Sequence, residues 1–323
     1  MWLDGREAAI LATGPGRDAL QVKFRGCLVG LALGDALGAP FEGAGPVSRA
    51  EVCAAAVQRE VLRYTDDTHM AIGVAESLVA CRGFDGRHMA DTFVRNFERE
   101  PWRGYGPGPP RVFRRIKSGA PCDKAAQEVY PGGSFGNGAA MWVAPVGLFY
   151  HRDPEKLREV AYLSGQITHT HPLGKEGAAL QAYAVALAAV FGPSGSLEDF
   201  LAGLKVFAAE EIYREKLEMV AGLLSGAGPA EVAAWLGNGV EAFNSVPAAI
   251  CCFLRYPDSC EEAVVEAPSL GGDADTIASM TGAISGAWLG IEAVPVEWAA
   301  KLENRAYIEE LAVRLGEAAL QQG

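Results

Sequence analysis

Paired cysteines, excess positive charge and long apolar runs are all missing from this sequence of 323 residues. The seven cysteines are odd in number and form no CxxC pair, which argues against a disulfide framework or a zinc ribbon. A net charge of -12 disfavours partners such as nucleic acid or an anionic membrane. No stretch reaches the ~18 uninterrupted apolar residues of a membrane span, and the charged start does not fit a signal peptide. We therefore expect a soluble cytoplasmic protein that binds neither nucleic acid nor membranes.

The sequence does contain two acidic clusters, one near each end of the chain. Their oxygen-bearing residues are Thr65, Asp66, Asp67 and Thr68 in the first cluster and Asp273, Asp275 and Thr276 in the second. Packing so many carboxylates together without a cation would be costly, because like charges and burial both oppose ionisation. Carboxylate and hydroxyl oxygens suit Mg²⁺, Mn²⁺ or Ca²⁺, whereas zinc usually recruits nitrogen or sulfur. The acids exceed what one hydrated Mg²⁺ needs, so the sequence predicts two Mg²⁺ ions held between the clusters.

Helix capping offers a simpler interpretation of either cluster. Thr65 and Asp273 are residue types that favour the N-cap position, and each precedes a stretch rich in small residues. The metal interpretation is favoured because both clusters are rich in acids. If they share a site, the chain between them folds around it as one domain, which we expect to span residues 24–323 after a leader of residues 1–23.

Most apolar segments are long, rich in alanine and without alternating β-branched residues, which favours helices over strands. Small residues at Ala278, Gly282 and Gly286 form one stripe, so another helix should approach closely there, and Gly290 is a candidate C-cap. The predicted fold is a compact all-α domain around a central site. We expect helices over Phe24–Leu37, Asp67–Cys81, Gly177–Phe191, Asp199–Leu224, Thr276–Leu289 and Val296–Leu320, with a further helical segment over Ala139–Val146 interrupted by Pro145.

Three other features could bind a ligand. The run Gly132-Gly133-Ser134-Phe135-Gly136-Asn137-Gly138 can expose successive N–H groups to an anion, although a structural turn is equally compatible with it. Phe135 adds a ring that could stack on a nucleoside. His169 fits a hydrogen bond to phosphate or ribose better than a metal, although a structural role is the commoner one. Glu42 lies in a Pro/Gly loop, where it could close over a substrate or simply face water.

In order along the chain, these motifs resemble those of the ADP-ribosylglycohydrolases. The resemblance runs from about Phe24 to near the C-terminus, and it implies an all-α fold with two Mg²⁺ ions in a cleft. It implies that the metal ligands are Glu42, Thr65, Asp66, Asp67, Asp273, Asp275 and Thr276. It also implies that ADP-ribose contacts Asp66, Gly132, Gly133, Ser134, Phe135, Gly136, Asn137, Gly138, His169 and Val240. ADP-ribose and ADP-ribosylated proteins are then the expected partners, and a monomer is the expected state.

Within the family, the chain is most similar to the branch that acts on ADP-ribosylserine and poly(ADP-ribose). Arg103-Gly104-Tyr105-Gly106 and Leu236-Gly237-Asn238-Gly239-Val240 match that branch. Trp142 stands where relatives commonly place arginine, and this departure leaves open which ADP-ribosyl linkage is cut. Ala274 replaces a frequent threonine, and Phe135 replaces a tyrosine of the eukaryotic branch.

The expected reaction is metal-dependent cleavage of the C1″ glycosidic bond, which releases ADP-ribose. Glycoside cleavage passes through an oxocarbenium-like state and needs an oriented water and a proton for the leaving group. Asp66, Asp67 and Asp275 are the hypothesised residues for the water, and Glu42 for the leaving group. O-acetyl-ADP-ribose is a further conceivable substrate. The alternatives are an arginine-specific ADP-ribosyl hydrolase, a di-metal phosphate-ester hydrolase, and a non-catalytic ADP-ribose-binding protein.

Overall fold

The computed structural model describes residues 15–321, and these form helices joined by loops. Two isolated bridges, Leu62 with Leu302 and Gly136 with Glu241, are the strand-like pairings in this part of the chain. The predicted all-α fold is confirmed. The α-helices are α2 Arg17–Gly38, α3 Arg49–Gln58, α4 Asp66–Cys81, α5 Gly86–Arg99, α6 Pro109–Lys117, α7 Ala125–Val129, α8 Gly138–Met141, α9 Ala144–Phe149, α10 Pro154–Gly165, α11 Pro172–Phe191, α12 Leu197–Phe207, α13 Glu211–Leu223, α14 Pro229–Leu236, α15 Ala242–Arg255, α16 Cys260–Glu266, α17 Ala274–Leu289, α18 Val296–Lys301 and α19 Arg305–Ala319. The short 3-10 helices are η1 Ala39–Phe41, η2 Gly192–Ser194, η3 Ala267–Leu270 and η4 Ile291–Ala293.

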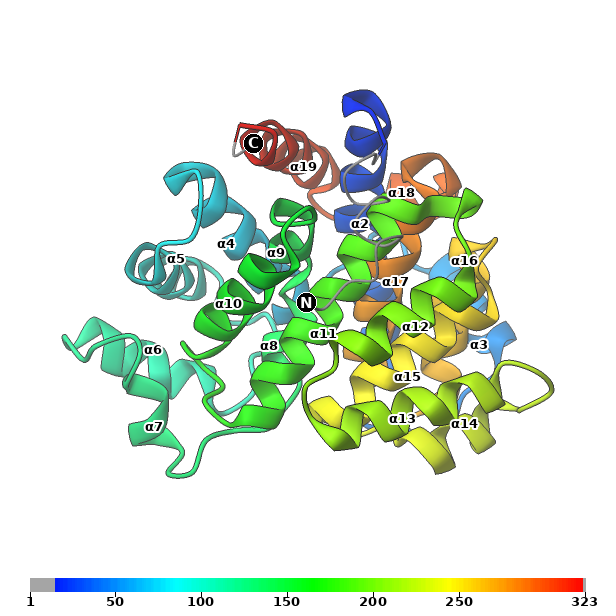
Figure 1. The fold of residues 1–323 in the computed structure, drawn as a ribbon, viewed down its shortest axis with the longest axis horizontal. Coiled ribbons are helices and arrows are strands. Elements are labelled where there is room, and N and C mark those ends of the chain that lie inside the picture. The colour runs from blue at the N-terminus through cyan, green and yellow to red at the C-terminus, as the bar shows by residue number, and fades with distance from the viewer. Residues whose placement is uncertain (1–14, 322–323) are drawn as a thin grey trace.

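The centre of the fold is the close pair of α2 and α17, which lie side by side in Figure 1. The stripe of small residues on α17 faces a matching stripe on α2. A Cβ added at Gly30 would lie 2.3 Å from the carbonyl oxygen of Gly282, and one added at Gly286 would lie 2.0 Å from that of Gly26. Only glycine permits such an approach of two backbones. The predicted close contact is therefore confirmed, and its partner is α2.

The direction of this packing brings together residues from opposite ends of the sequence. Gly26 meets Gly286 at one end of the pair, whereas Gly38 meets Ala274 at the other, so the two helices are antiparallel. The C-terminal end of α2 thus lies beside the N-terminal end of α17. Glu42 follows the first of these ends and Asp273 precedes the second.

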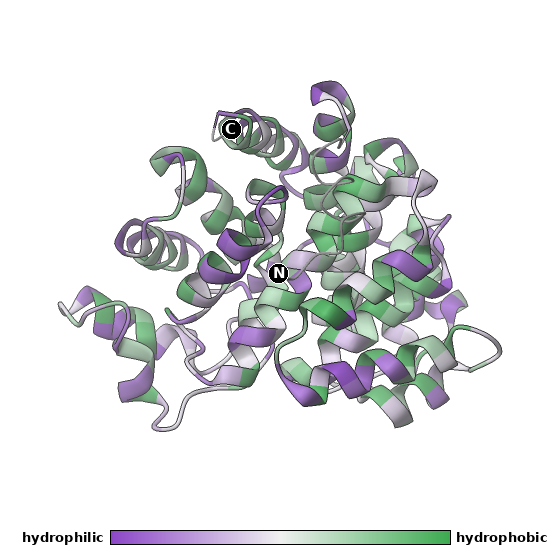
Figure 2. Ribbon diagram, viewed as in Figure 1, coloured by the Kyte–Doolittle hydropathy of each residue, from purple (hydrophilic) through white to green (hydrophobic). Residues whose placement is uncertain are grey.

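Other helices cover this pair on both sides. α11 and α15 contact α17, while α4 and α19 contact α2 and each other. In Figure 1, α4 to α7 lie at the left of the molecule and α12 to α16 at the right. Figure 2 shows hydrophobic residues concentrated on the inner helices and hydrophilic ones on the outer turns. The burial of nearly all of α11 confirms the predicted core helix at Gly177–Phe191.

Two helices were predicted too long. The segment 199–224 is divided into α12 and α13, because the buried carboxylate of Glu176 accepts a hydrogen bond from the backbone N–H of Ala209 at 2.6 Å. The segment 296–320 is divided into α18 and α19, because Leu302 pairs with Leu62 and Asn304 has a left-handed backbone with φ 54°. In both cases, distant residues bind backbone groups that a continuous helix would use.

The first core helix extends beyond its predicted start, since α2 begins at Arg17 rather than Phe24. Of the predicted leader, residues 1–14 lie outside the described residues. The expected segment 139–146 is two short helices, α8 and α9, with Pro145 in the first turn of α9. Gly290 caps α17 with φ 91°, as expected.

Two segments, 17–41 and 172–194, are long and apolar enough to cross a membrane by length and composition alone. Within the fold, however, 78% and 89% of their most apolar windows are buried among other helices. Core helices of a compact protein meet the same criterion, so these two segments are weak evidence for a span.

Candidate metal centre and ADP-ribose cleft

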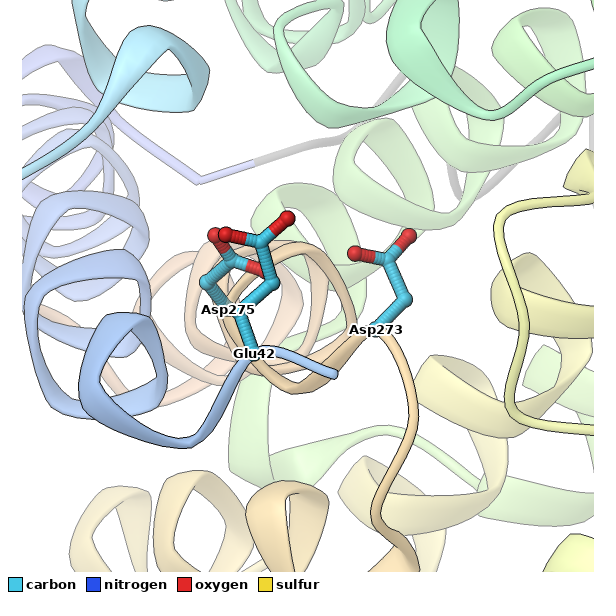
Figure 3. Close-up of side chains that lie close together, drawn as sticks. All are labelled: Glu42, Asp273 and Asp275. Carbon is cyan, nitrogen blue, oxygen red and sulfur yellow. The ribbon is translucent and has the colours of Figure 1, made fainter. Parts of the chain in front are cut away.

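Three carboxylates meet where α2 ends and α17 begins. One oxygen each from Glu42, Asp273 and Asp275 lie within 4.8 Å of one another. Figure 3 shows Glu42 on the loop after η1 and the two aspartates at the start of α17, with all three carboxylates directed to the same side. The antiparallel helix pair therefore brings the predicted loop acid and the second acidic cluster together.

A pair of glycine turns holds this arrangement. The N–H of Gly43 donates to the carbonyl of Gly272 at 2.8 Å, and the N–H of Gly272 donates to the carbonyl of Ala44 at 3.0 Å. Gly272 has φ +72°, and a Cβ there would lie 2.2 Å from the carbonyl oxygen of Asn238. A side chain at this position would push the turn before Asp273 away from Asn238, whose carbonyl accepts a hydrogen bond from the N–H of Asp273 at 2.8 Å.

Asp35, a fully buried residue of α2, holds the first acidic cluster next to these carboxylates. Its carboxylate accepts hydrogen bonds from the N–H of Thr65 at 2.9 Å, the N–H of Thr68 at 3.0 Å and the Thr68 hydroxyl at 2.6 Å. A negative charge is favourable beside the free N–H groups at the start of α4. Asp35 thus fixes the start of α4, from which Asp66 and Asp67 enter the site.

Thr65 also occupies the N-cap position of α4, where its hydroxyl accepts from the N–H of Asp67 at 3.4 Å. Asp273 stands at the N-cap of α17 but makes no side-chain capping bond. Its carboxylate instead accepts from the side-chain amide of Asn137, which also donates to the hydroxyl of Ser245 at 3.0 Å. Capping therefore accounts for part of the role of Thr65 and leaves the Asp273 carboxylate directed at the site.

Burial and mutual repulsion hold the acids partly protonated in the absence of a cation. Burial, together with the charges of Asp35 and Glu42, raises the pKa of Asp66 to about 7. Burial and the Asp273 charge raise the pKa of Asp275 to about 9, and the pKa of Asp67 rises well above its ordinary value for the same kinds of reason. Burial also raises the pKa of Glu42, with a smaller contribution from Asp273. Within residues 15–321, the charges that shift these pKa values most are those of neighbouring carboxylates.

One oxygen of the cluster is left without a partner. Asp67 is 2% exposed, and its buried Oδ2 atom has no hydrogen-bond donor within residues 15–321. A buried carboxylate oxygen without a partner is unfavourable unless something binds it. The donor set contains only carboxylate and hydroxyl oxygens, which are the ligands of hard divalent cations. The residues therefore fit a divalent metal, in keeping with the predicted metal centre.

The cluster forms one end of a cleft of about 280 Å³. Most of the predicted site residues line it together, and they come from both acidic clusters, the glycine run and the segment around Val240. They are Glu42, Asp66, Asp67, Ser134, Gly136, Asn137, Gly138, His169, Val240, Asp273, Asp275 and Thr276. Thr65, Gly132, Gly133 and Phe135 are not among the lining residues. The Phe135 ring is 45% exposed and lies 5.5 Å from that of His171, so it stands at the outer edge.

The glycine run is a tightly bonded loop that passes over His169. The N–H of Gly136 donates to the Ser134 hydroxyl at 3.2 Å, and that of Asn137 donates to the Val240 carbonyl at 2.8 Å. The loop therefore has fewer free N–H groups for an anion than its sequence suggests. A Cβ at Gly138 would lie 2.5 Å from the His169 ring, so glycine allows the loop to lie against this ring. Burial lowers the pKa of His169 to about 4, which keeps it neutral at physiological pH.

The structure adds residues to which sequence reasoning gave no role. Asp35 is one, and an acid inside an apolar helix was the available signal. Arg103 is another: its guanidinium lies 4.2 Å from the Tyr64 ring centre and binds the Tyr64 carbonyl at 3.1 Å and Glu303 at 2.6 Å. Because Tyr64 immediately precedes Thr65, Arg103 helps to position the first acidic cluster. No local pattern reveals a contact with a residue 200 positions away.

Trp142 and the loop after Arg103 are both candidates for determining substrate choice, but only the loop lines the cleft. Trp142 is 1% exposed and packs against Phe93 at a ring separation of 5.5 Å, so it lies behind the cleft wall and does not line it. The loop that follows Arg103 does line it, through Gly104, Gly106, Pro107, Gly108 and Pro109.

Nearly the whole chain is similar to proteins of one known family. The model of the ADP-ribosylglycohydrolase family matches residues 16–323. The chain is 38% identical to ADP-ribosylhydrolase ARH3 of Mus musculus, with 91% of this chain and 90% of that protein covered. It is also 38% identical to ARH3 of Homo sapiens over 91% and 92% of the two chains. A solved structure of an ADP-ribosylglycohydrolase-related protein complex matches with TM-score 0.74 and 30% identity, over 94% of this chain and 99% of that one. Fold, motifs and overall similarity agree, and this chain belongs to the ADP-ribosylglycohydrolase family.

Proposed function

We propose that this protein is a hydrolase that binds two Mg²⁺ ions and cleaves the C1″ glycosidic bond of ADP-ribosyl groups to release ADP-ribose. The observation that carries the proposal is the meeting of both acidic clusters at one end of a cleft whose other wall is the glycine run. A cytoplasmic location belongs to the same proposal, supported by seven cysteines that are all unpaired.

The ions would be held by the carboxylates and hydroxyls of the two clusters. The ligands would be Glu42, Thr65, Asp66, Asp67, Asp273, Asp275 and Thr276. Bound there, divalent cations would neutralise the clustered charge and supply a Lewis acid for the sugar hydroxyls and a nearby water. The unpartnered Oδ2 atom of Asp67 supports this assignment, because no donor among the described residues 15–321 binds it.

The protein's own residues then divide the work of hydrolysis. Asp66, Asp67 and Asp275 would orient the water that attacks C1″ and accept its proton. The bond between C1″ and the leaving oxygen breaks, and Glu42 would donate a proton to that oxygen. Glu42 lies on a loop and lines the cleft beside Asp273 and Asp275, so a proton donor at this position would stand next to the metal centre. Neutral His169 and the glycine run would hold the diphosphate and ribose.

The linkage that we favour is serine-linked ADP-ribose or poly(ADP-ribose). The basis is the match of the 103–106 and 236–240 segments to that branch, together with relatives named ADP-ribosylhydrolase ARH3. The loop 104–109 lies over the first acidic cluster, since a Cβ at Gly104 would be 3.7 Å from that of Thr65. This position supports a role for the loop in contacting the acceptor.

The test is release of free ADP-ribose from serine-linked, arginine-linked and poly(ADP-ribose) substrates, each with Mg²⁺ and with EDTA. We expect Mg²⁺-dependent release, greatest from the serine-linked or polymeric substrate. Release from the arginine-linked substrate alone would move the protein to the arginine-specific alternative. Binding of ADP-ribose without release from any substrate would make it a non-catalytic reader. Products other than intact ADP-ribose would indicate a phosphate-ester hydrolase.

Two variants separate the proposed roles. Glu42→Gln should lower kcat by about 100-fold or more, a usual effect of losing a general acid, with a smaller loss of ADP-ribose affinity. Asp275→Asn should lose metal binding and turnover together, as measured by calorimetry and product release. Glu60→Gln, at an exposed position in a bend, is the matched control. A fully active Glu42→Gln protein would exclude Glu42 as the proton donor.

A further inference from the structure

A second, smaller groove lies on the surface beside α6. Its volume is about 230 Å³, and we refer to it as the α6 groove. It is lined by Arg111, Arg114, Arg115, Ser118, Glu128 and Val129. The three arginines lie on one exposed side of α6, whose opposite side is buried through Val112, Phe113 and Ile116. This placement leaves the guanidinium groups at the surface.

The positive charge of this groove contrasts with the net charge of the whole chain, which is -12. Within residues 15–321, Arg114 has no carboxylate partner. Arg115 has one partner, Glu128 at 3.2 Å, and both side chains are about half exposed. The Arg111 guanidinium lies 5.8 Å from the centre of the Tyr130 ring. Much of the charge in the α6 groove is therefore free to bind an anion.

The α6 groove lies next to the cleft, with Arg111 of the groove near Tyr130 of the cleft. Tyr130, which Arg111 overlies, is itself a lining residue of the cleft. The loop 104–109 begins against the first acidic cluster, where a Cβ at Gly104 would be 3.8 Å from Oδ1 of Asp66. It ends at Pro109, the first residue of α6. A substrate that leaves the metal end of the cleft along this loop would therefore reach the arginines.

We propose that the α6 groove binds the diphosphate of the neighbouring ADP-ribose unit when the substrate is a chain of such units. This inference rests on the proposed function. A guanidinium group can donate two parallel hydrogen bonds to the oxygens of one phosphate. Ionised carboxylates cannot donate hydrogen bonds and repel phosphate. An acidic protein would otherwise repel a polyanionic chain, so cations placed beside the cleft are the feature that admits it. The expected consequence is a preference for chains over single ADP-ribosyl groups.

The test compares a groove variant with a matched control. The groove variant is Arg114→Glu with Arg115→Glu, which leaves Arg111 and Tyr130 in place. The control is Arg17→Glu with Arg314→Glu, the same change of charge at two exposed arginines, one at the start of α2 and one in α19. Figure 1 shows these two helices at the top of the molecule and α6 at the lower left. Holo protein with Mg²⁺ is assayed for kcat/KM on ADP-ribose oligomers of defined length and on a peptide carrying a single serine-linked ADP-ribose. Circular dichroism and thermal unfolding check that both variants fold.

We expect the ratio of oligomer to single-unit kcat/KM to fall about tenfold in the groove variant, the size of effect expected from a few charged hydrogen bonds at a surface. The control should keep the wild-type ratio. Raising salt from about 50 to 200 mM should lower the ratio in the wild type and much less in the groove variant. These three results together support the inference.

Several outcomes would overturn it, and they differ from failure of the proposed function. An equal loss of kcat/KM on oligomers and on single units in the groove variant would show that the groove does not bind the neighbouring unit of a chain. An equal loss in the control would assign the effect to net charge. A wild-type enzyme that releases ADP-ribose only from single units would refute the groove while leaving the hydrolase intact. Absence of release from every substrate would instead refute the proposed function.

Discussion

The closeness of α2 and α17 makes one substitution informative. In Gly30→Ala, the added Cβ would lie 2.3 Å from the Gly282 carbonyl oxygen, whereas real Cβ contacts below 3.0 Å essentially do not occur. The obstacle is backbone on a facing helix, so no side chain can rotate away. The two helices must separate, and the ends of these helices carry Glu42 and Asp273. We therefore expect both lower stability and weaker metal binding.

The size of the effect follows from two opposing contributions. Overpacking a close-packed interior costs about 1–3 kcal/mol, and a contact between two backbones belongs at the upper end of that range. Alanine returns up to about 1 kcal/mol through its better helix propensity. The net loss is about 2 kcal/mol. For 323 residues the unfolding entropy near the midpoint is about 0.7 kcal/mol/K, so Tm should fall by about 3 °C.

The chain offers a control of identical chemistry. Gly222 lies in α13, is exposed, and has nothing within 4 Å of an added Cβ. Gly222→Ala should gain about 0.5–1 kcal/mol, which is a rise of about 1 °C in Tm. Thermal unfolding with Mg²⁺ and with EDTA, followed by circular dichroism, measures both variants. If Gly30→Ala were as stable as Gly222→Ala, the close backbone contact between α2 and α17 would be refuted.

Two further predictions concern the acids and their support. Without metal, the folded protein holds protons on Asp66 and Asp275, with pKa values of about 7 and 9, that the unfolded chain has already released. Its Tm in EDTA should therefore fall as pH rises from 6 to 9, and Mg²⁺ should raise Tm most at pH 9; a Tm that rises with pH would contradict this. Arg103→Lys should lower stability by about 1–3 kcal/mol in chemical unfolding, because lysine cannot bridge Glu303 and the Tyr64 carbonyl as the arginine fork does. Unchanged stability and metal affinity would remove Arg103 from the support of the first cluster.

The sequence alone determined the parts of this protein that depend on local patterns. Alanine-rich apolar segments without alternation predicted the helices, and the stripe at Ala278, Gly282 and Gly286 predicted a close helix partner. The chemistry of the two acidic clusters predicted a cation, because carboxylates that meet in a fold require one. The motifs also indicated the family, which the comparisons confirm. The roles of the individual residues, two Mg²⁺ ions, the monomeric state and the domain boundaries stay predictions.

Only the tertiary structure decided which residues meet. The antiparallel contact of α2 with α17 places Glu42 beside Asp273, and it rests on contacts between residues some 250 positions apart. Glu176 and Leu62 divide two predicted helices because they bind backbone groups far from them in sequence. Asp35 and Arg103 likewise contact residues far from them in sequence, and the α6 groove lies beside a cleft formed by other segments. Local propensity carries no information about such contacts, since burial and charge pairing act between residues that are close in space rather than in sequence.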